Sequence, residues 1–394
     1  MPLVLFKNAR LVRGTGTDSG IEVVDIAVGG STILAVEHGI SAGTLGGEVI
    51  DLQGRVVIPG LVDGHVHFLG AAGDEGYSSK TPEVYLSHFV TAGVTTAVGC
   101  LGFGRGSEDL RHLYVKAQTL ASEGLSTYIY TGSFQLPSPS ITGSAAQDLV
   151  LLPYVLGVKV AIADAYSSQP TASELARLAG EAFVAGLQSG KPGLLHVHVG
   201  HQGDPFDLIR QVQKLSGVPK KQFILTHCNW SSSLVEGALE YARDGGFVDF
   251  STVLSPKRGS VTSISAADAL RRLMEGGVPI AQVTFSSDGN VGMPMRNADG
   301  TQRGLYLERM ESLWEEIKSL VKDGLPLGQV IRVATENPAR RLGLYPRKGA
   351  VEAGSDADMI VLNDDLSIQA VYLGGKPAVR NGKPVLFSRF ESVD

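Results

Sequence analysis

The alternation of short apolar runs with longer amphipathic segments is the feature of this sequence that most constrains its fold. It begins near residue 60 and continues through eight units to about residue 343. Eight strand-then-helix units predict a (β/α)8 TIM barrel, whose usual size is about 250 residues. A doubly wound open sheet shares this alternation, but the first strand is followed by no G-x-G-x-x-G motif, so a dinucleotide-binding sheet is disfavoured. The predicted strands are Leu61–His67, Thr95–Leu101, Ser126–Phe134, Val155–Ala163, Leu194–Gly200, Phe223–Cys228, Phe247–Val253 and Val283–Ser287.

The segments between these strands carry apolar residues at helical spacing. Several end in a glycine, at Gly93, Gly124, Gly190 and Gly245, where a left-handed helix cap is expected. The predicted helices are Glu83–Thr91, Glu108–Ala121, Ala172–Leu187, Asp207–Leu215, Leu234–Arg243, Ala266–Met274, Glu308–Val321 and Gln329–Leu342.

Both ends of the chain read as short strands separated by turns. A few N-terminal strands alone would leave exposed edges, so the C-terminal strands are their natural partners. We therefore predict a small β-sandwich domain from residues 1–59 plus 344–394, and a barrel from residues 60–343. The predicted strands of the small domain are Leu3–Leu11, Glu22–Val28, Ile33–Glu37, Val49–Val57, Met359–Leu362, Gln369–Leu373 and Lys383–Phe387.

The composition favours a globular protein without a nucleic-acid or membrane partner. The net charge of −6 argues against a nucleic-acid surface, and no apolar stretch has the length of a membrane span. Met1 to Arg13 lacks the pattern of a signal peptide. The two cysteines, Cys100 and Cys228, form no C-x-x-C pair, so we expect a reducing, cytoplasmic location.

Five of the predicted strands end in residues that commonly bind metal ions. Barrel enzymes place their reactive groups at these C-terminal strand ends. Two of the residues are His65 and His67, which are two apart in a strand, so both imidazoles face the same side. Together the group predicts a metal centre at one end of the barrel: His65, His67, Lys159, His198, His227 and Asp288.

Each of these residues, taken alone, has a simpler structural explanation. A lone strand histidine is more often a core residue, and we assign that role to His196 and His201, which flank His198. An Asp-Gly pair such as the one at Asp288 is usually a turn. A lysine in an apolar strand is harder to explain, because burying an unpaired ammonium is costly, so Lys159 needs a partner or a changed charge.

The number of candidate ligands predicts two ions rather than one. Neutral imidazoles and carboxylates suit Zn²⁺, although Co²⁺ and Mn²⁺ accept similar ligands. Lys159 could bridge two cations only as an anionic group, so we hypothesise that CO₂ carbamylates it. Two such ions activate water at neutral pH and polarise a carbonyl, while Asp288 moves a proton to the leaving amine. The expected reaction is hydrolysis of an amide-like bond.

These residues resemble the amidohydrolase superfamily over the whole chain, and its isoaspartyl (β-aspartyl) dipeptidases in particular. The resemblance implies a (β/α)8 barrel, two zinc ions, a carbamylated lysine and a homo-oligomer, an octamer in that family. By position it assigns His65, His67 and Asp288 to one ion, His198 and His227 to the other, and the bridge to Lys159. The motifs that carry the resemblance are Val62–His67, Lys80–Val84, Thr91–Thr95, Ile141–Ser144, Gly190–Gly193 and Ser286–Asn290.

The substrate pocket departs from that family in a consistent direction. Two arginines that hold the substrate carboxylate correspond to Trp230 and Tyr166, a carbonyl-polarising tyrosine to Phe134, and a threonine to Phe103. An indole cannot replace the bidentate fork of an arginine. The changes favour a bulkier, less charged amide or carbamate over a free dipeptide, unless these aromatic side chains only pack the barrel rim.

Three further positions complete the expected pocket. The glutamate that binds the substrate amino group corresponds to Asp74, with Glu75 beside it, and a pocket serine corresponds to Gly292. A cation from a nearby loop could still hold a carboxylate, and the candidates are Lys257, Arg258 and Arg296.

The prediction is thus a two-metal hydrolase acting on a small-molecule amide or dipeptide-like substrate. An alternative is a cyclic-amide hydrolase of the hydantoinase or dihydroorotase kind, which shares the metal centre. An alternative of another class is a metal-free assembly protein without activity, but such a protein would have no need of all six ligands.

Overall fold

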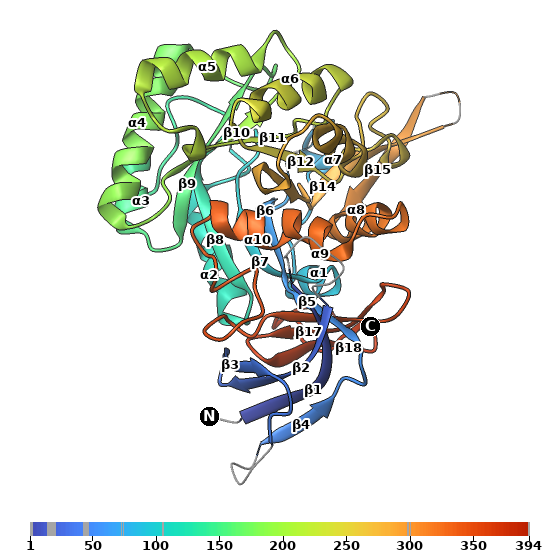
Figure 1. Cartoon of the computed structure of the whole chain (residues 1–394). Helices are drawn as coiled ribbons and strands as arrows, with labels where there is room; N and C mark the ends of the chain where they lie inside the picture. The colour runs from blue at the N-terminus through green and yellow to red at the C-terminus, as the bar shows by residue number, and fades with distance from the viewer. Residues whose placement is uncertain are drawn as a thin grey trace.

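The computed structural model describes residues 3–13, 21–41, 47–71, 73, 75–104, 106–297, 299 and 301–392. A barrel surrounded by helices forms the upper part of the molecule in Figure 1, and a sheet built from both chain ends forms the lower part. Among the described residues, no helix has the length and apolar character needed to cross a membrane.

The predicted barrel is confirmed by eight parallel strands in the order β13-β12-β11-β10-β9-β8-β7-β6. The first and last of these strands meet through a parallel bridge between Val66 and Gly289, which brings the sheet close to a full ring. The strands are β6 (Leu61–Val66), β7 (Val94–Gly99), β8 (Ser126–Gly132), β9 (Val155–Ile162), β10 (Leu194–Val199), β11 (Phe223–Thr226), β12 (Val248–Ser251) and β13 (Val283–Ser286).

Each barrel strand is followed by a helix. The helix Ala145–Leu151 after β8 was not predicted, whereas each of the other seven overlaps a predicted helix. The glycines expected after helices all have positive φ angles, 78° at Gly93, 113° at Gly124, 67° at Gly190 and 83° at Gly245. The helices of the barrel are α1 (Leu86–Thr91), α2 (Leu110–Ser122), α3 (Ala145–Leu151), α4 (Ala172–Ser189), α5 (Pro205–Ser216), α6 (Ser232–Arg243), α7 (Ala266–Glu275) and α8 (Glu311–Lys322).

The helix predicted over Gln329–Leu342 is wrong as a single element. The segment contains the end of α9 (Leu327–Val330), a 3₁₀ turn at Ile331–Ala334 and α10 (Glu336–Arg341). Thr335 leaves the helical region, with φ −132° and ψ −86°. Pro338 has no N–H to donate four residues back, so a continuous helix through this point would lack a hydrogen bond.

A β-hairpin after the last barrel strand was not predicted. It consists of β14 (Val291–Arg296) and β15 (Gln302–Glu308), and it projects from the upper right of the molecule in Figure 1. The sequence does not indicate this hairpin because Pro294 lies in β14, and proline usually argues against a strand. A two-stranded hairpin consists only of edge strands, which tolerate proline. The helix expected from Glu308 therefore begins later, at α8.

Nine strands from both chain ends form one sheet in the order β19-β18-β17-β16-β5-β1-β2-β3, with β4 paired to β1. The expected strand Val49–Val57 is two strands, because Gln53 and Gly54 form a turn with φ angles of 56° and 73°. The strands are β1 (Leu3–Val12), β2 (Ile21–Gly29), β3 (Thr32–Glu37), β4 (Glu48–Asp51), β5 (Val56–Pro59), β16 (Met359–Leu362), β17 (Ile368–Leu373), β18 (Lys376–Arg380) and β19 (Lys383–Pro384).

Strand alternation joins this sheet to the barrel. In β16, Met359 and Val361 pack in the core of the terminal sheet, whereas Ile360 and Leu362 pack in the main core of the barrel. Successive side chains of a strand point to opposite faces, so one strand contributes to both cores. The two ends of the chain thus form one layer beneath the barrel. The boundaries at residues 59 and 344 stay a prediction.

We expect Lys348→Met to destabilise the protein by about 3–5 kcal/mol, because the buried carboxylate of Asp358 would lose its cation. Lys348 is buried and lies 2.7 Å from Asp356 and 2.6 Å from Asp358. The control is Lys220→Met, which removes an exposed pair with Asp244 and should cost less than about 1 kcal/mol. Chemical unfolding of both variants measures the difference, and equal losses would contradict this account.

Candidate functional site

The six predicted metal-ligand residues converge at the C-terminal end of the barrel. Apart from His65 and His67, which are two residues apart, these residues are distant in the sequence, so the barrel brings them together. His65 lies in β6 and His67 directly after it, Lys159 in β9, His198 in β10, His227 directly after β11, and Asp288 two residues after β13.

The Asp288 carboxylate lies between three imidazoles. Its Oδ1 is 3.3 Å from Nε2 of His65 and 3.2 Å from Nε2 of His67, and its Oδ2 is 3.8 Å from Nδ1 of His227. Buried Oδ1 nevertheless makes no well-directed hydrogen bond among the described residues. Tetrahedral bonds of about 2.1 Å would place neighbouring ligand atoms roughly 3.4 Å apart. The spacing is therefore that of atoms around a common cation.

His198 and His227 each have one ring nitrogen held by the protein. Nε2 of His198 lies 2.8 Å from Oδ2 of Asp164, and Nδ1 of His227 lies 2.6 Å from Oγ of Ser251. Nδ1 of His198 is buried and has no hydrogen-bond partner among the described residues. A metal-binding histidine typically has its other nitrogen fixed in this way, so the unpartnered Nδ1 fits a ligand atom.

Lys159 is fully buried at the floor of the site. Its Nζ lies 3.0 Å from Nε2 of His65 and 3.1 Å from Sγ of Cys100, and 5.2 Å from the centre of the Phe134 ring. Neither polar partner carries a fixed negative charge, although a buried ammonium needs one. This environment is consistent with a lysine whose charge is changed by modification.

The electrostatics of the site favour the protonation states that bind metal. Burial, together with the nearby Lys159, lowers the pKa of His65 and of His227 well below the ordinary value, so both imidazoles are neutral at pH 7. Burial acts to raise the pKa of Asp288, but His227, His67 and Lys159 outweigh it and lower this pKa to about 2. Neutral imidazoles beside an ionised carboxylate are the ligand forms of these residues.

Two of the candidate ligands hold an unusual backbone conformation. His227 has a φ angle of 66° and Asp288 one of 55°, in the left-handed region that residues other than glycine rarely adopt. Such conformations cost about 1–3 kcal/mol each and are concentrated at functional sites. Here they occur one residue after β11 and two residues after β13, and both side chains line the cavity.

The two histidines assigned a structural role have different surroundings. Nε2 of His196 lies 3.0 Å from Nδ1 of His65, and its ring stacks on Tyr130 with centroids 4.4 Å apart. His196 therefore supports the orientation of a candidate ligand. The core role predicted for His201 is wrong, because this residue follows β10 in an exposed turn, where its ring centroid lies 5.9 Å from that of Trp230.

A cavity of about 470 Å³ opens above the candidate ligands. Phe103 stacks on Tyr166 with ring centroids 4.4 Å apart, and the Phe134 ring lies 6.2 Å from Phe103. The unpredicted hairpin contributes further apolar side chains to the cavity, among them Met293 and Leu305. The predicted substrate residues that line the cavity are Phe103, Phe134, Tyr166, Trp230 and Gly292.

Of the two predicted amino-group ligands, Glu75 does not line this cavity: it is exposed and accepts a hydrogen bond from Gln302 of the hairpin. The other, Asp74, lies outside the described residues. Two of the three candidate replacement cations do not line the cavity either, and the Arg296 side chain lies outside the part that the structure describes. Arg258 forms an ion pair with Glu308, and Lys257 is exposed. Of the lysines and arginines that the structure describes, only Lys159 lines the cavity.

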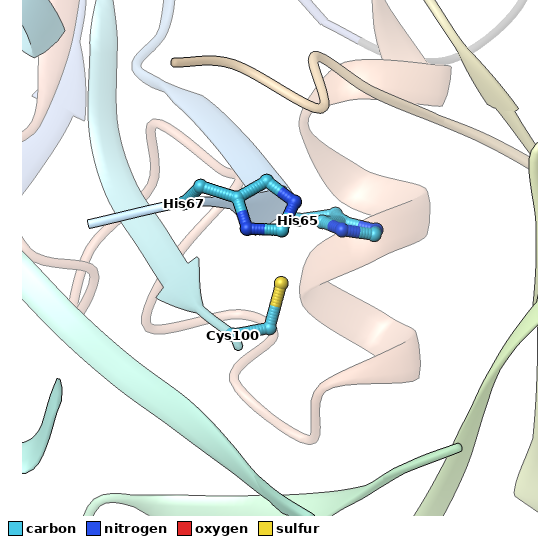
Figure 2. A group of neighbouring side chains, drawn as sticks. All are labelled: His65, His67 and Cys100. Atoms are coloured by element: carbon cyan, nitrogen blue, oxygen red, sulfur yellow. The ribbon is translucent and has the colours of Figure 1, made fainter. Parts of the chain in front are cut away.

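Sequence reasoning missed Cys100 and Asp164. Cys100 directly follows β7 and Asp164 comes two residues after β9, so the same strand-end rule that selected the histidines could have selected both. Donor atoms of His65, His67 and Cys100 lie within 4.8 Å of one another, as do those of His65, His227 and Asp288. Figure 2 shows the Cys100 thiol pointing toward the two imidazole rings.

Comparison with solved structures shows similarity over the full length of the chain. The β-aspartyl dipeptidase of Fervidobacterium islandicum AW-1, solved in complex with β-Asp-Leu dipeptide, is 33% identical, with a TM-score of 0.87 and coverage of 100% of both chains. A dihydropyrimidinase from Brevibacillus agri NCHU1002 has a TM-score of 0.68 over 98% of this chain and 97% of that chain. At 16% identity it shares the fold alone.

Comparison with curated sequences and family models gives the broader relationship. An adenine deaminase of Serratia proteamaculans (strain 568) is 25% identical over 400 residues, covering 96% of this chain and 57% of that relative. This chain thus spans little more than half the length of that protein. The model of the amidohydrolase family matches residues 56–378. With the barrel and its strand-end histidines in place, this match over most of the chain shows that the protein belongs to the amidohydrolase family.

Proposed function

We propose that this protein is a two-metal hydrolase of amide bonds whose substrate presents an uncharged, aromatic or apolar group to the cavity. The observation that carries the proposal is the convergence of six ligand-type side chains beneath a cavity with an aromatic wall. The similarity to a β-aspartyl dipeptidase supports the class of bond. The departures from such a dipeptidase lie in the cavity wall.

The residues would hold two divalent ions, with zinc as the expected metal. His65, His67 and Asp288 would bind one ion, His198 and His227 the other, and carbamylated Lys159 would bridge them. The unpartnered Nδ1 of His198 and the crowding of nitrogens around Asp288 Oδ1 both fit this arrangement. Such ions supply Lewis acidity to a carbonyl and lower the pKa of water.

Asp288 is the proposed acid–base residue. Its carboxylate is ionised and its side chain keeps 15% exposure at the cavity floor. It accepts the proton of the attacking water and delivers it to the leaving nitrogen, the two proton transfers that amide hydrolysis requires. Asp164 holds His198 in place through the contact between its Oδ2 and Nε2 of the imidazole. Burial acts to raise the pKa of Asp164, but hydrogen bonds from His198 and from the Tyr166 N–H outweigh it and lower this pKa.

The cavity disfavours a substrate with a free carboxylate. An anion buried there without a cation would cost several kcal/mol, since Arg258 is already paired with Glu308. The stacked Phe103 and Tyr166, together with Phe134, offer a surface for a flat or apolar group. The proposed substrate is therefore an N-acyl or N-aryl amide, or a carbamate, rather than an acidic dipeptide.

We further propose a cytoplasmic location and a homo-oligomeric assembly. Both cysteines are free thiols buried in the protein, which suits a reducing compartment. The assembly rests on resemblance to the dipeptidases, for which an octamer is the expectation, and size-exclusion chromatography with light scattering measures it directly.

We expect kcat/KM for neutral N-acyl or N-aryl amides to exceed that for β-Asp-Leu by at least about tenfold, because each unpaired buried charge costs more than 1.4 kcal/mol. Trp230→Arg should narrow this gap by restoring a cation to the cavity. Measuring kcat/KM for hydantoin and dihydrouracil as well distinguishes this proposal from the cyclic-amide alternative. A wild-type preference for β-Asp-Leu would refute the proposed specificity, and a preference for the rings would favour the alternative.

Removing the metals should abolish activity and lower the melting temperature. Ions that bind only the folded state stabilise it by about 4 kcal/mol when present at a thousandfold excess over Kd. Dialysis against a chelator, followed by Zn²⁺ addition, should remove and then restore both properties, with two ions per chain by elemental analysis. Full activity in metal-free protein would contradict the proposal.

Lys159→Ala should lose at least about a hundredfold in kcat and regain part of it with a short carboxylic acid, which can replace the carbamate as a bridging ligand. The matched control is Lys191→Ala, which removes a half-buried lysine that donates to the carbonyls of Leu149 and Leu152. That variant should keep its metal content and activity. A Lys159→Ala protein with both ions and normal kcat would exclude a bridging role.

A further inference from the structure

The cavity above the candidate ligands has two walls of different chemistry. An aromatic wall comes from the loops after β7, β8 and β9, and consists of Phe103, Phe134 and Tyr166. An aliphatic wall comes from the loop after β12 and from the β14–β15 hairpin. Its apolar side chains include those of Leu254, Val261, Met293, Pro294 and Leu305. Among the described residues of this second wall, the polar side chains are the hydroxyl groups of Ser260 and Thr262.

The two walls lie on opposite sides of the barrel mouth. In the strand order, β8 is four positions from β12, and β9 is four positions from β13. Because the ring of eight strands closes between β6 and β13, four positions is the greatest separation that it allows. Phe103 comes from the loop after β7, but its ring stacks on Tyr166 with centroids 4.4 Å apart, which places it with the residues after β9. Trp230 follows β11, midway between β9 and β13.

Asp288 determines which half of the substrate meets which wall. It lies three residues before the hairpin begins at Val291, on the side of the aliphatic wall. In the proposed function it protonates the leaving nitrogen, and a proton donor must lie within about 3 Å of the atom that it protonates. A trans amide directs the groups on its carbon and its nitrogen away from each other. The amine substituent therefore extends toward the aliphatic wall, and the acyl substituent toward the aromatic wall.

The aromatic wall has a surface against which another ring can pack. Tyr166 is 43% exposed, and its ring is nearly parallel to that of Phe103, at an angle of 14°. Phe134 lies beside this stack at an angle of 74° to Phe103. Aromatic pairs prefer these offset-stacked and edge-to-face arrangements. The carboxylate on this side, that of Asp164, already accepts hydrogen bonds from His198 and from the Tyr166 N–H.

We propose that the substrate is an amide between an arylalkanoic acid and an aliphatic amine, an inference that rests on the proposed function. The arene packs against Phe103 and Tyr166, and the amine chain against the β14–β15 hairpin. During hydrolysis the water oxygen bonds to the carbonyl carbon and the C–N bond breaks. Both water protons end on the leaving nitrogen, the first of them carried by Asp288, so the products are an arylalkanoate and an alkylammonium ion.

The test compares two isomers that differ only in the direction of the amide. N-butyl phenylacetamide carries its ring on the acyl side, and N-benzyl pentanamide carries the same ring on the amine side. Zinc-loaded wild-type protein should hydrolyse N-butyl phenylacetamide with a kcat/KM about fivefold to tenfold higher, which is the effect expected of one favourable aromatic contact. Because the two rates are measured on one protein sample, their ratio does not depend on the fraction of active protein.

Variants on each wall should change this ratio in opposite ways. Phe103→Leu should lower kcat/KM for N-butyl phenylacetamide about fivefold and leave that for N-benzyl pentanamide nearly unchanged. Leu305→Phe should instead raise kcat/KM for N-benzyl pentanamide, because it adds a ring to the aliphatic wall. The matched control is Phe183→Leu, which changes a partly buried phenylalanine of α4 outside the cavity and should keep the wild-type ratio.

The outcomes separate this inference from the function on which it rests. Equal or reversed preference in wild type, or a Phe103→Leu protein that loses both activities to the same extent, would overturn the assignment of the walls and leave amide hydrolysis intact. Hydrolysis of other amides but of neither isomer would overturn the substrate class. A zinc-loaded protein that hydrolyses no amide would overturn the proposed function as well.

Discussion

The barrel closes where its first and last strands meet, and the candidate metal centre is built from the same residues. The N–H of Asp288 donates to the carbonyl of His65, and the N–H of His67 to the carbonyl of Gly289. Beneath them, Oδ1 of buried Asp63 accepts the N–H groups of Ser287 and His65. Ring closure therefore fixes the backbone of three candidate ligands, and the site can form only when the whole barrel has formed.

This closure requires ionisable groups in the barrel interior, where charge is costly. Burial raises the pKa of Asp63 and that of Asp249 to about 7 despite their hydrogen bonds. The Asp249 carboxylate accepts hydrogen bonds from the hydroxyl groups of Thr226, Thr284 and Ser286, which lie on the two neighbouring strands. Because buried polar groups are costly without partners, this shared acceptor ties β11, β12 and β13 together. The turns carrying His227 and Asp288 start from these strands.

The structure separates the chemistry of the site from its selectivity. The candidate ligands lie in or directly after barrel strands, whose positions are fixed by neighbouring strands on both sides. The cavity wall comes instead from loops and from the β14–β15 hairpin, which the barrel ladder does not constrain. A different side chain at position 230 can therefore change the cavity wall without disturbing the floor. This division is common in barrel proteins, whose function varies through loops on a constant scaffold.

Much of this architecture could be predicted because it follows from local patterns. The eight strands and their helices appear as changes in hydrophobic period, and the six candidate ligands as polar residues where apolar strands end. The hairpin was missed because proline in β14 removes the local signal of a strand. Asp164 and Cys100 also lie at strand ends, but the sequence does not show which residues they contact. Asp164 contacts His198 and Cys100 contacts Lys159, each on another strand.

The sequence by itself determined the barrel, the pairing of its two chain ends and the residues at the strand ends. These depend on the spacing of apolar and polar residues along short segments, which any reader of the chain can count. Only the tertiary structure decided which side chains meet across the barrel: that Arg258 is paired with Glu308, that Glu75 turns to the hairpin, and that a thiol lies beside Lys159. Such contacts join residues far apart in the chain, and their geometry is set by the packing of the entire ring of strands.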